Sequence, residues 1–167
     1  MISKIVVLDL ETSGIDLIGN GIVEFRAIVV DLQSGEVISQ FNLLTKPESP
    51  TRLSKLVEEI TGIHNGLLSN APNNIDALRQ FDEFAAGKPI WVYNLPFTSK
   101  FLKKVSHKDY ELKDILALVR EKRPELKNST LKTAAEQMVV EIKEDLGRMR
   151  DCFIAKDILL KVHNIKS

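Results

Sequence analysis

Three segments in the first quarter of the chain are rich in β-branched and aliphatic residues, with polar turn residues between them. Such runs predict β-strands, here at residues 3–10, 22–30 and 36–44. Gln33-Ser34-Gly35 is typical of a hairpin turn, so the second and third strands should be antiparallel. A proline-containing stretch at 46–50 then ends this part of the sheet.

The rest of the chain has apolar residues mainly at helical spacing, interrupted by a further strand at 90–93. The spacing and the caps predict helices at 54–60, from Asn74, from Pro96, and at 113–123, 129–138 and 147–164. Three strands followed by helices that alternate with strands describe an α/β fold, a mixed sheet flanked by helices.

Composition narrows the class of protein. A chain of 167 residues favours one compact domain, and it contains no apolar run of the roughly 20 residues that a membrane span needs. Together with an N-terminus unlike a signal peptide, this predicts a cytoplasmic protein without a membrane partner. The balance of 23 basic and 23 acidic residues argues against indiscriminate binding to nucleic acid. A local phosphate site stays open, because a metal ion can supply positive charge.

Two carboxylates, Asp9 and Glu11, lie at the end of the first strand. Residues i and i+2 of a strand point to the same face, roughly 7 Å apart, where two charges repel by about 2 kcal/mol at an effective dielectric near 20. Protonation, exposure to water or a cation between them would relieve this repulsion. The third arrangement is a site for a hard divalent ion such as Mg²⁺ or Mn²⁺.

Several segments from about residue 4 to residue 162 form a recognisable series. They are Asp9-Leu10-Glu11-Thr12-Ser13-Gly14, Ile22-Val23-Glu24, Ile60-Thr61-Gly62-Ile63-His64, a second motif at 93–102, the helices at 114–118 and 131–136, and Asp151. With these segments in this order, the chain resembles the DEDD 3′–5′ exonuclease family, which includes the proofreading (epsilon) subunit of DNA polymerase III and ribonuclease T.

The resemblance implies a ribonuclease H-like mixed sheet of about five strands, the first three antiparallel, in a single exonuclease-like domain over residues 1–167. In the family, four carboxylates hold two divalent ions about 4 Å apart at the scissile phosphate. Asp9, Glu11 and Asp151 match three of these metal-binding, catalytic positions. Thr12, Ser13, His64 and Asn94 match substrate-binding positions. The implied partners are a single-stranded DNA or RNA 3′ end and a DNA polymerase or other replication or repair protein.

The sequence departs from the family at two catalytic positions. Thr98 replaces the second-motif aspartate, so the site offers three negative charges in place of four. Leu146 replaces the histidine general base, a group that typically contributes about 10²–10⁴ in rate. Tyr93 and Arg26 stand where the family usually has His and Gly, and we rank them as lesser departures.

Other readings of the same residues stay open. Asp9 and Glu11 could be an exposed strand end, and Asp151 a carboxylate that favours a helix dipole. Asp114 is better explained as a helix cap than as a ligand. Arg148 and Arg150 are as compatible with a solvated helix end as with phosphate contacts.

The sequence therefore leaves three hypotheses about function, and whether the chain is an enzyme stays undecided. The first is a metal-dependent 3′–5′ exonuclease, a hydrolase with impaired activity, using Mg²⁺ or Mn²⁺. The second is a catalytically degenerate member, with one ion or none, that binds nucleic acid or a polymerase-type partner without cutting. The third is an unrelated α/β protein with chance similarity.

Overall fold

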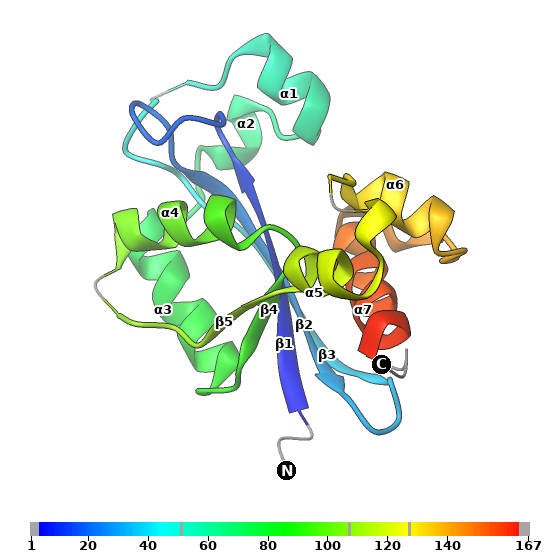
Figure 1. The fold of residues 1–167 in the computed structure, drawn as a ribbon. Helices are drawn as coiled ribbons and strands as arrows, with labels where there is room; N and C mark the ends of the chain where they lie inside the picture. The colour runs from blue at the N-terminus through cyan, green and yellow to red at the C-terminus, as the bar shows by residue number, and fades with distance from the viewer. Residues whose placement is uncertain (1–3, 51, 107, 127, 164–167) are drawn as a thin grey trace.

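The computed structural model describes residues 4–50, 52–106, 108–126 and 128–163. One mixed sheet has the strand order β3-β2-β1-β4-β5 and separates two groups of helices (Figure 1). β1 (Lys4–Thr12), β2 (Ile22–Asp31) and β3 (Val37–Leu44) are antiparallel neighbours, whereas β4 (Ile90–Val92) and β5 (Leu112–Asp114) add in parallel. The predicted sheet of about five strands, with the first three antiparallel, is confirmed.

The predicted helices appear in the expected order with small changes at their ends, and the short helix α2 was not predicted. They are α1 (Lys55–Thr61), α2 (Asn65–Leu68), α3 (Asn74–Ala85), α4 (Leu95–Val105), α5 (Ile115–Lys122), α6 (Leu131–Gln137) and α7 (Arg150–His163), with 3₁₀ turns η1 (Pro124–Leu126) and η2 (Glu144–Met149). Among the described residues, no helix is both long and apolar enough to cross a membrane.

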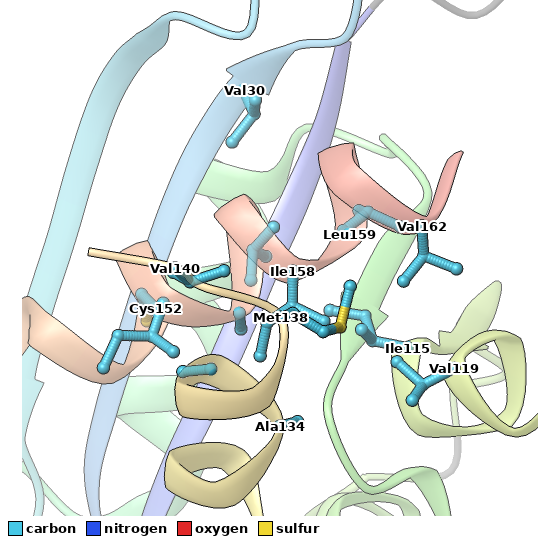
Figure 2. Close-up of a cluster of buried hydrophobic side chains, with 14 of the residues drawn as sticks. Val30, Ile115, Val119, Ala134, Met138, Val140, Cys152, Ile158, Leu159 and Val162 are labelled. Carbon is cyan, nitrogen blue, oxygen red and sulfur yellow. The ribbon is translucent and has the colours of Figure 1, made fainter. Parts of the chain in front are cut away.

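The two faces of the sheet belong to two different hydrophobic cores, because side chains alternate between faces along a strand. In β1, Ile5 and Val7 pack against α5, α6 and α7, whereas Val6 and Leu8 pack against α3 and α4. Figure 2 shows the first of these cores, in which Cys152 of α7 lies among the buried side chains. The odd-numbered positions of β1 therefore face α7, and this decides where Asp9 and Glu11 point.

The late starts of α5 and α7, predicted from 113 and from 147, each have a clear structural cause. Leu112–Asp114 pair with β4 as the short strand β5, and the side chain of Asp114 then caps α5 by accepting from Leu116 N at 2.9 Å. The expectation that Asp114 is a cap is confirmed. The last helix begins at Arg150 and not at 147, because Gly147 adopts φ 52° and ψ −129°, which interrupts the helical turn.

Candidate functional site

Three acidic side chains converge where the end of β1 meets the first turn of α7. Asp9, Glu11 and Asp151 each offer one carboxylate oxygen, and these oxygens all lie within 4.8 Å of one another. β1 supplies two of them because positions 9 and 11 share the face covered by α7, whose first turn supplies Asp151. We call these three residues the carboxylate cluster. Their meeting argues against the chance-similarity hypothesis, which expected them to lie apart.

A side chain from β2 lies inside the carboxylate cluster. Arg26 is the direct antiparallel partner of Asp9, so both side chains project from the same face of the sheet. Its Nη2 donates to Asp9 Oδ2, and lies 2.5 Å from Glu11 Oε1 and 3.7 Å from Asp151 Oδ2. One guanidinium nitrogen thus contacts all three acids, with only 8% of the arginine side chain exposed.

A second arginine neutralises the neighbouring buried acid on β2. Glu24 is the cross-strand partner of Glu11, and its side chain is fully buried. Arg148 of η2 donates from Nε and Nη2 to the two Glu24 oxygens, at 2.7 Å each, in a bidentate pair. Asn42 Nδ2 of β3 donates to the same carboxylate at 2.6 Å. Of the two readings of Arg148, neither describes its position, because its guanidinium is committed to Glu24.

The two arginines are linked to each other. Arg26 Nη1 donates to the backbone carbonyl of Arg148 at 3.0 Å, and the Cys152 thiol donates to the carbonyl of Arg26 at 3.3 Å. Arg26 Nε is buried and has no hydrogen-bond partner among the described residues. The hydrogen bonds of its two terminal nitrogens therefore orient the guanidinium. Nη2 points toward the acids, and Nη1 points toward the segment just before α7.

Burial and crowding of like charges change the ionisation of this cluster. Burial raises the pKa of the Glu11 carboxyl to about 7, opposed by the charge of Arg26 and assisted by that of Asp9. Burial also raises the pKa of Asp9, again against the effect of Arg26. Desolvation alone would lower the pKa of Arg26, but Asp9, Glu11 and Glu24 reverse this and raise it. One fixed positive charge therefore faces more acid groups than it can neutralise.

Divalent ions do not fit the cluster as it stands. Mg²⁺ and Mn²⁺ require oxygen ligands, and three suitable oxygens are present. The space shared by these oxygens, however, holds Arg26 Nη2 in contact with all three acids. An ion could reach three carboxylates at once only if the guanidinium left, which would abandon its bond to the Arg148 carbonyl.

The expected substrate-binding residues of the first motif hold the loop after β1. Thr12 Oγ1 donates to the carbonyl of Gly14 at 2.8 Å. Ser13 Oγ donates to Asn20 Oδ1 at 3.2 Å and accepts from Gly21 N at 3.0 Å. Both side chains are buried, so the contacts that the structure gives them are local.

The other two expected substrate-binding residues lie at helix starts. His64 is exposed at the N-terminal end of α2 and makes no capping bond with its side chain. Asn94 is exposed and caps α4, accepting from Phe97 N at 3.3 Å. A substrate role for all four residues stays a prediction.

The two positions that depart from the family pattern, 98 and 146, add no acid or base to the carboxylate cluster. Thr98 is buried on α4 and brings no carboxylate. Leu146, in η2, lines a cavity of about 520 Å³ together with Val37 and Phe153, and none of the three clustered acids lines it. The side chain at position 146, where the family carries its general base, thus faces a cavity that the three acids do not line.

The residue that sequence interpretation undervalued is Arg26. Ranking it as a lesser departure was wrong, because its guanidinium lies at the centre of the carboxylate cluster. A signal was available: Glu24 and Arg26 are the charged residues in the otherwise apolar run 22–30, two positions apart and hence on one face. A charged side chain on the buried face of a strand needs a partner of opposite charge, so the pair predicts charged partners on neighbouring elements.

Comparisons with known proteins identify the family of this chain. A family model described as Exonuclease (RNase_T) matches residues 6–145. The chain is 30% identical over 164 residues to the PolC-type DNA polymerase III of Bacillus subtilis, covering 94% of this chain and 11% of that protein. It is 35% identical over 121 residues to the PolC-type enzyme of Thermotoga petrophila, covering 69% and 9%. The chain thus spans about a tenth of the length of these relatives.

Solved structures show the same fold at lower identity. The nuclease domain of 3′hExo, a DEDDh family member bound to rAMP, superposes with a TM-score of 0.79 at 15% identity, covering 97% of this chain and 91% of that one. Exonuclease X in complex with 5′-overhanging duplex DNA gives 0.78 at 17% identity, covering 96% and 91%. The matched family model, the five-stranded sheet and the converging acids agree: the chain belongs to the exonuclease family and has a ribonuclease H-like fold.

Proposed function

We propose that this chain binds the 3′ end of single-stranded DNA or RNA without hydrolysing it. The observation that carries the proposal is the Arg26 guanidinium in contact with Asp9, Glu11 and Asp151. The exonuclease hypothesis and the degenerate hypothesis share the fold and the acids. They differ in whether two ions can enter, and Arg26 favours the degenerate one.

Two further positions support the absence of efficient cutting. Two-metal hydrolysis requires ligands on both sides of the ion pair, and Thr98 supplies no carboxylate. Leu146 cannot accept a proton, which removes a contribution of about 10²–10⁴ in rate. An exonuclease with Mg²⁺ or Mn²⁺ would have to overcome these losses together with the presence of Arg26.

The support for binding an end comes from the residues that remain exposed and from the relatives. The side chains of Glu11 and Asp151 are 24% and 36% exposed, so their oxygens can accept a hydrogen bond from a 3′-hydroxyl. The structural neighbours are named as bound to rAMP or to DNA, and the sequence relatives are polymerases. A DNA polymerase or another replication or repair protein in the cytoplasm is the protein partner that we propose.

Labelled single-stranded DNA and RNA oligonucleotides, incubated with the protein in EDTA and in Mn²⁺, test the proposal. We expect binding that does not need Mn²⁺ and no shortening of the strand. A 3′-phosphate should bind more weakly than a 3′-hydroxyl, because the carboxylate cluster repels an anion. Stepwise shortening from the 3′ end, abolished by Asp9→Ala, would show that the site still cuts and would overturn the proposal.

A further inference from the structure

We infer that Arg26 is the resident cation of the carboxylate cluster, that it replaces divalent ions there, and that it fastens the start of α7 to the sheet. This inference rests on the proposed function only in that both exclude ions bound for hydrolysis. It adds that the site has a structural role, in which the Arg26 side chain holds the start of α7 against the sheet. That role can be measured without nucleic acid.

The position of Arg26 is fixed from the backbone outward. Residue 26 lies in the middle of β2, paired with Asp9 of β1 on one side and with Asn42 of β3 on the other. Its own carbonyl accepts from the Cys152 thiol of α7. A residue in a central strand cannot swing away, so only the side-chain torsions could carry the guanidinium out of the carboxylate cluster.

The guanidinium then contacts two separate parts of the chain. Nη2 contacts the acids from β1 and α7, and Nη1 donates to the carbonyl of Arg148 just before α7 begins. Arg148 is itself tied to the buried Glu24, which also accepts from Asn42. These contacts link β1, β2, β3, η2 and α7, so Arg26 connects segments that are far apart in sequence.

The charge balance explains why a cation is required at this point. Asp9, Glu11 and Asp151 would repel one another if they were ionised together in a mostly buried place. A guanidinium satisfies several carboxylate oxygens with directed hydrogen bonds and cannot dissociate as an ion can. When it is removed, the same three oxygens are left as a vacant site for a divalent ion.

The test is a rescue experiment with Mn²⁺ alone. The wild-type protein should show no saturable Mn²⁺ binding in calorimetry, and its melting temperature should be the same in EDTA and in Mn²⁺. Arg26→Ala should melt lower in EDTA and regain melting temperature as Mn²⁺ is added. It should also bind Mn²⁺ saturably, at least about tenfold more tightly than the upper limit of affinity that calorimetry sets for wild type. The ion would then take over the task of the lost arginine.

Two control variants separate this explanation from general loosening. Arg26→Ala combined with Asp9→Asn should lose the Mn²⁺ rescue, because a ligand is gone. Arg79→Ala removes an exposed arginine that pairs with Asp76 on α3, and should behave as wild type. Rescue that persists without Asp9, or no rescue of a folded Arg26→Ala protein, would overturn the inference.

The wild-type titration decides the question even when Arg26→Ala does not fold. Saturable Mn²⁺ binding by wild type that Asp9→Asn removes would mean that the ion displaces Arg26, and the inference would be wrong. The absence of such binding supports it. A wild-type protein that fails to bind oligonucleotides, whatever its response to Mn²⁺, would overturn the proposed function alone, whereas shortening of the strand in Mn²⁺ would overturn both.

Discussion

An arginine side chain contacts each of the acidic residues Asp9, Glu11 and Glu24 of β1 and β2. Glu11 and Glu24 are direct cross-strand partners, an arrangement that would destabilise the sheet if both were ionised without counter-charges. Each has its own arginine: Arg26 contacts Glu11, and Arg148 contacts Glu24. The stability of this part of the sheet therefore depends on particular side chains, and substitutions there should have effects larger than those on an ordinary surface.

Removal of Arg148 should be strongly destabilising. Glu24 is fully buried, and Arg148→Ala would leave its carboxylate without its bidentate partner. We expect a loss of about 3–5 kcal/mol in the free energy of unfolding, measured by urea denaturation. Adding Glu24→Gln should recover part of this loss, because the unpaired charge is then absent. Equal losses in the single and double variants would contradict the explanation.

Glu11 should make the stability of the protein depend on pH. Burial raises its pKa from 4.5 to about 7, so the folded state binds a proton more tightly than the unfolded state does. Its contribution to stability is therefore complete below pH 4.5 and is lost as the pH rises through 7, a change on the order of 3 kcal/mol. Urea denaturation in EDTA from pH 4.5 to 7.5 measures it. Glu11→Gln should remove this part of the slope, and identical slopes would refute the assignment.

Helix ends near the carboxylate cluster are set by local backbone chemistry that hydrophobic spacing does not report. The periodicity of 147–164 predicts one helix, yet the turn at Gly147 delays its start to Arg150 and so places Asp151 in the first turn. Similarly, Leu112–Asp114 have no long apolar run and become a strand only because β4 offers an edge to pair with. The start of α7 depends on the conformation of one glycine and β5 depends on a contact with β4, and the spacing of apolar residues reports neither.

Gly147 delays the start of α7, and a single substitution can test the effect of its backbone conformation. At φ 52° and ψ −129° an L side chain is strained, although a Cβ there would meet no atom within 4 Å. Gly147→Ala should therefore cost about 1–3 kcal/mol through backbone strain alone. Asp145→Ala, at an exposed position of the same 3₁₀ segment, should change the free energy of unfolding by less than about 0.5 kcal/mol. Similar losses in the two variants would contradict this account.

Across the whole molecule, the sheet divides the apolar interior into two cores, and the carboxylate cluster belongs to the side covered by α7. The order of the elements, the antiparallel beginning of the sheet and the Asp9–Glu11 pair could be predicted from strand and helix periodicity, whereas Asp151 was expected only from the resemblance to the exonuclease family. The occupation of the cluster by Arg26 could not be predicted, because it depends on the register that places residue 26 opposite residue 9. Register is fixed by the packing of both faces together.

Core substitutions on the two sides of the sheet should have different consequences for the carboxylate cluster. Ile158 of α7 and Phe81 of α3 are both fully buried, and truncation to Ala should cost about 2–5 kcal/mol in each case. Only Ile158→Ala loosens the helix that carries Asp151. Hydrogen exchange should therefore rise in α7 before global unfolding in Ile158→Ala and not in Phe81→Ala. Equal local exchange in both would mean that the two cores are not separate.

The direct pairing of residues 9 and 26 also has a consequence for comparing related sequences. Because the two positions lie opposite each other on adjacent strands, a relative that carries the first acidic motif and an arginine at the position of Arg26 can be recognised from an alignment without a structure. If Arg26 excludes ions as we propose, relatives with glycine at this position should bind Mn²⁺ at the carboxylates, and relatives with arginine there should not. One column of an alignment would then separate the two groups.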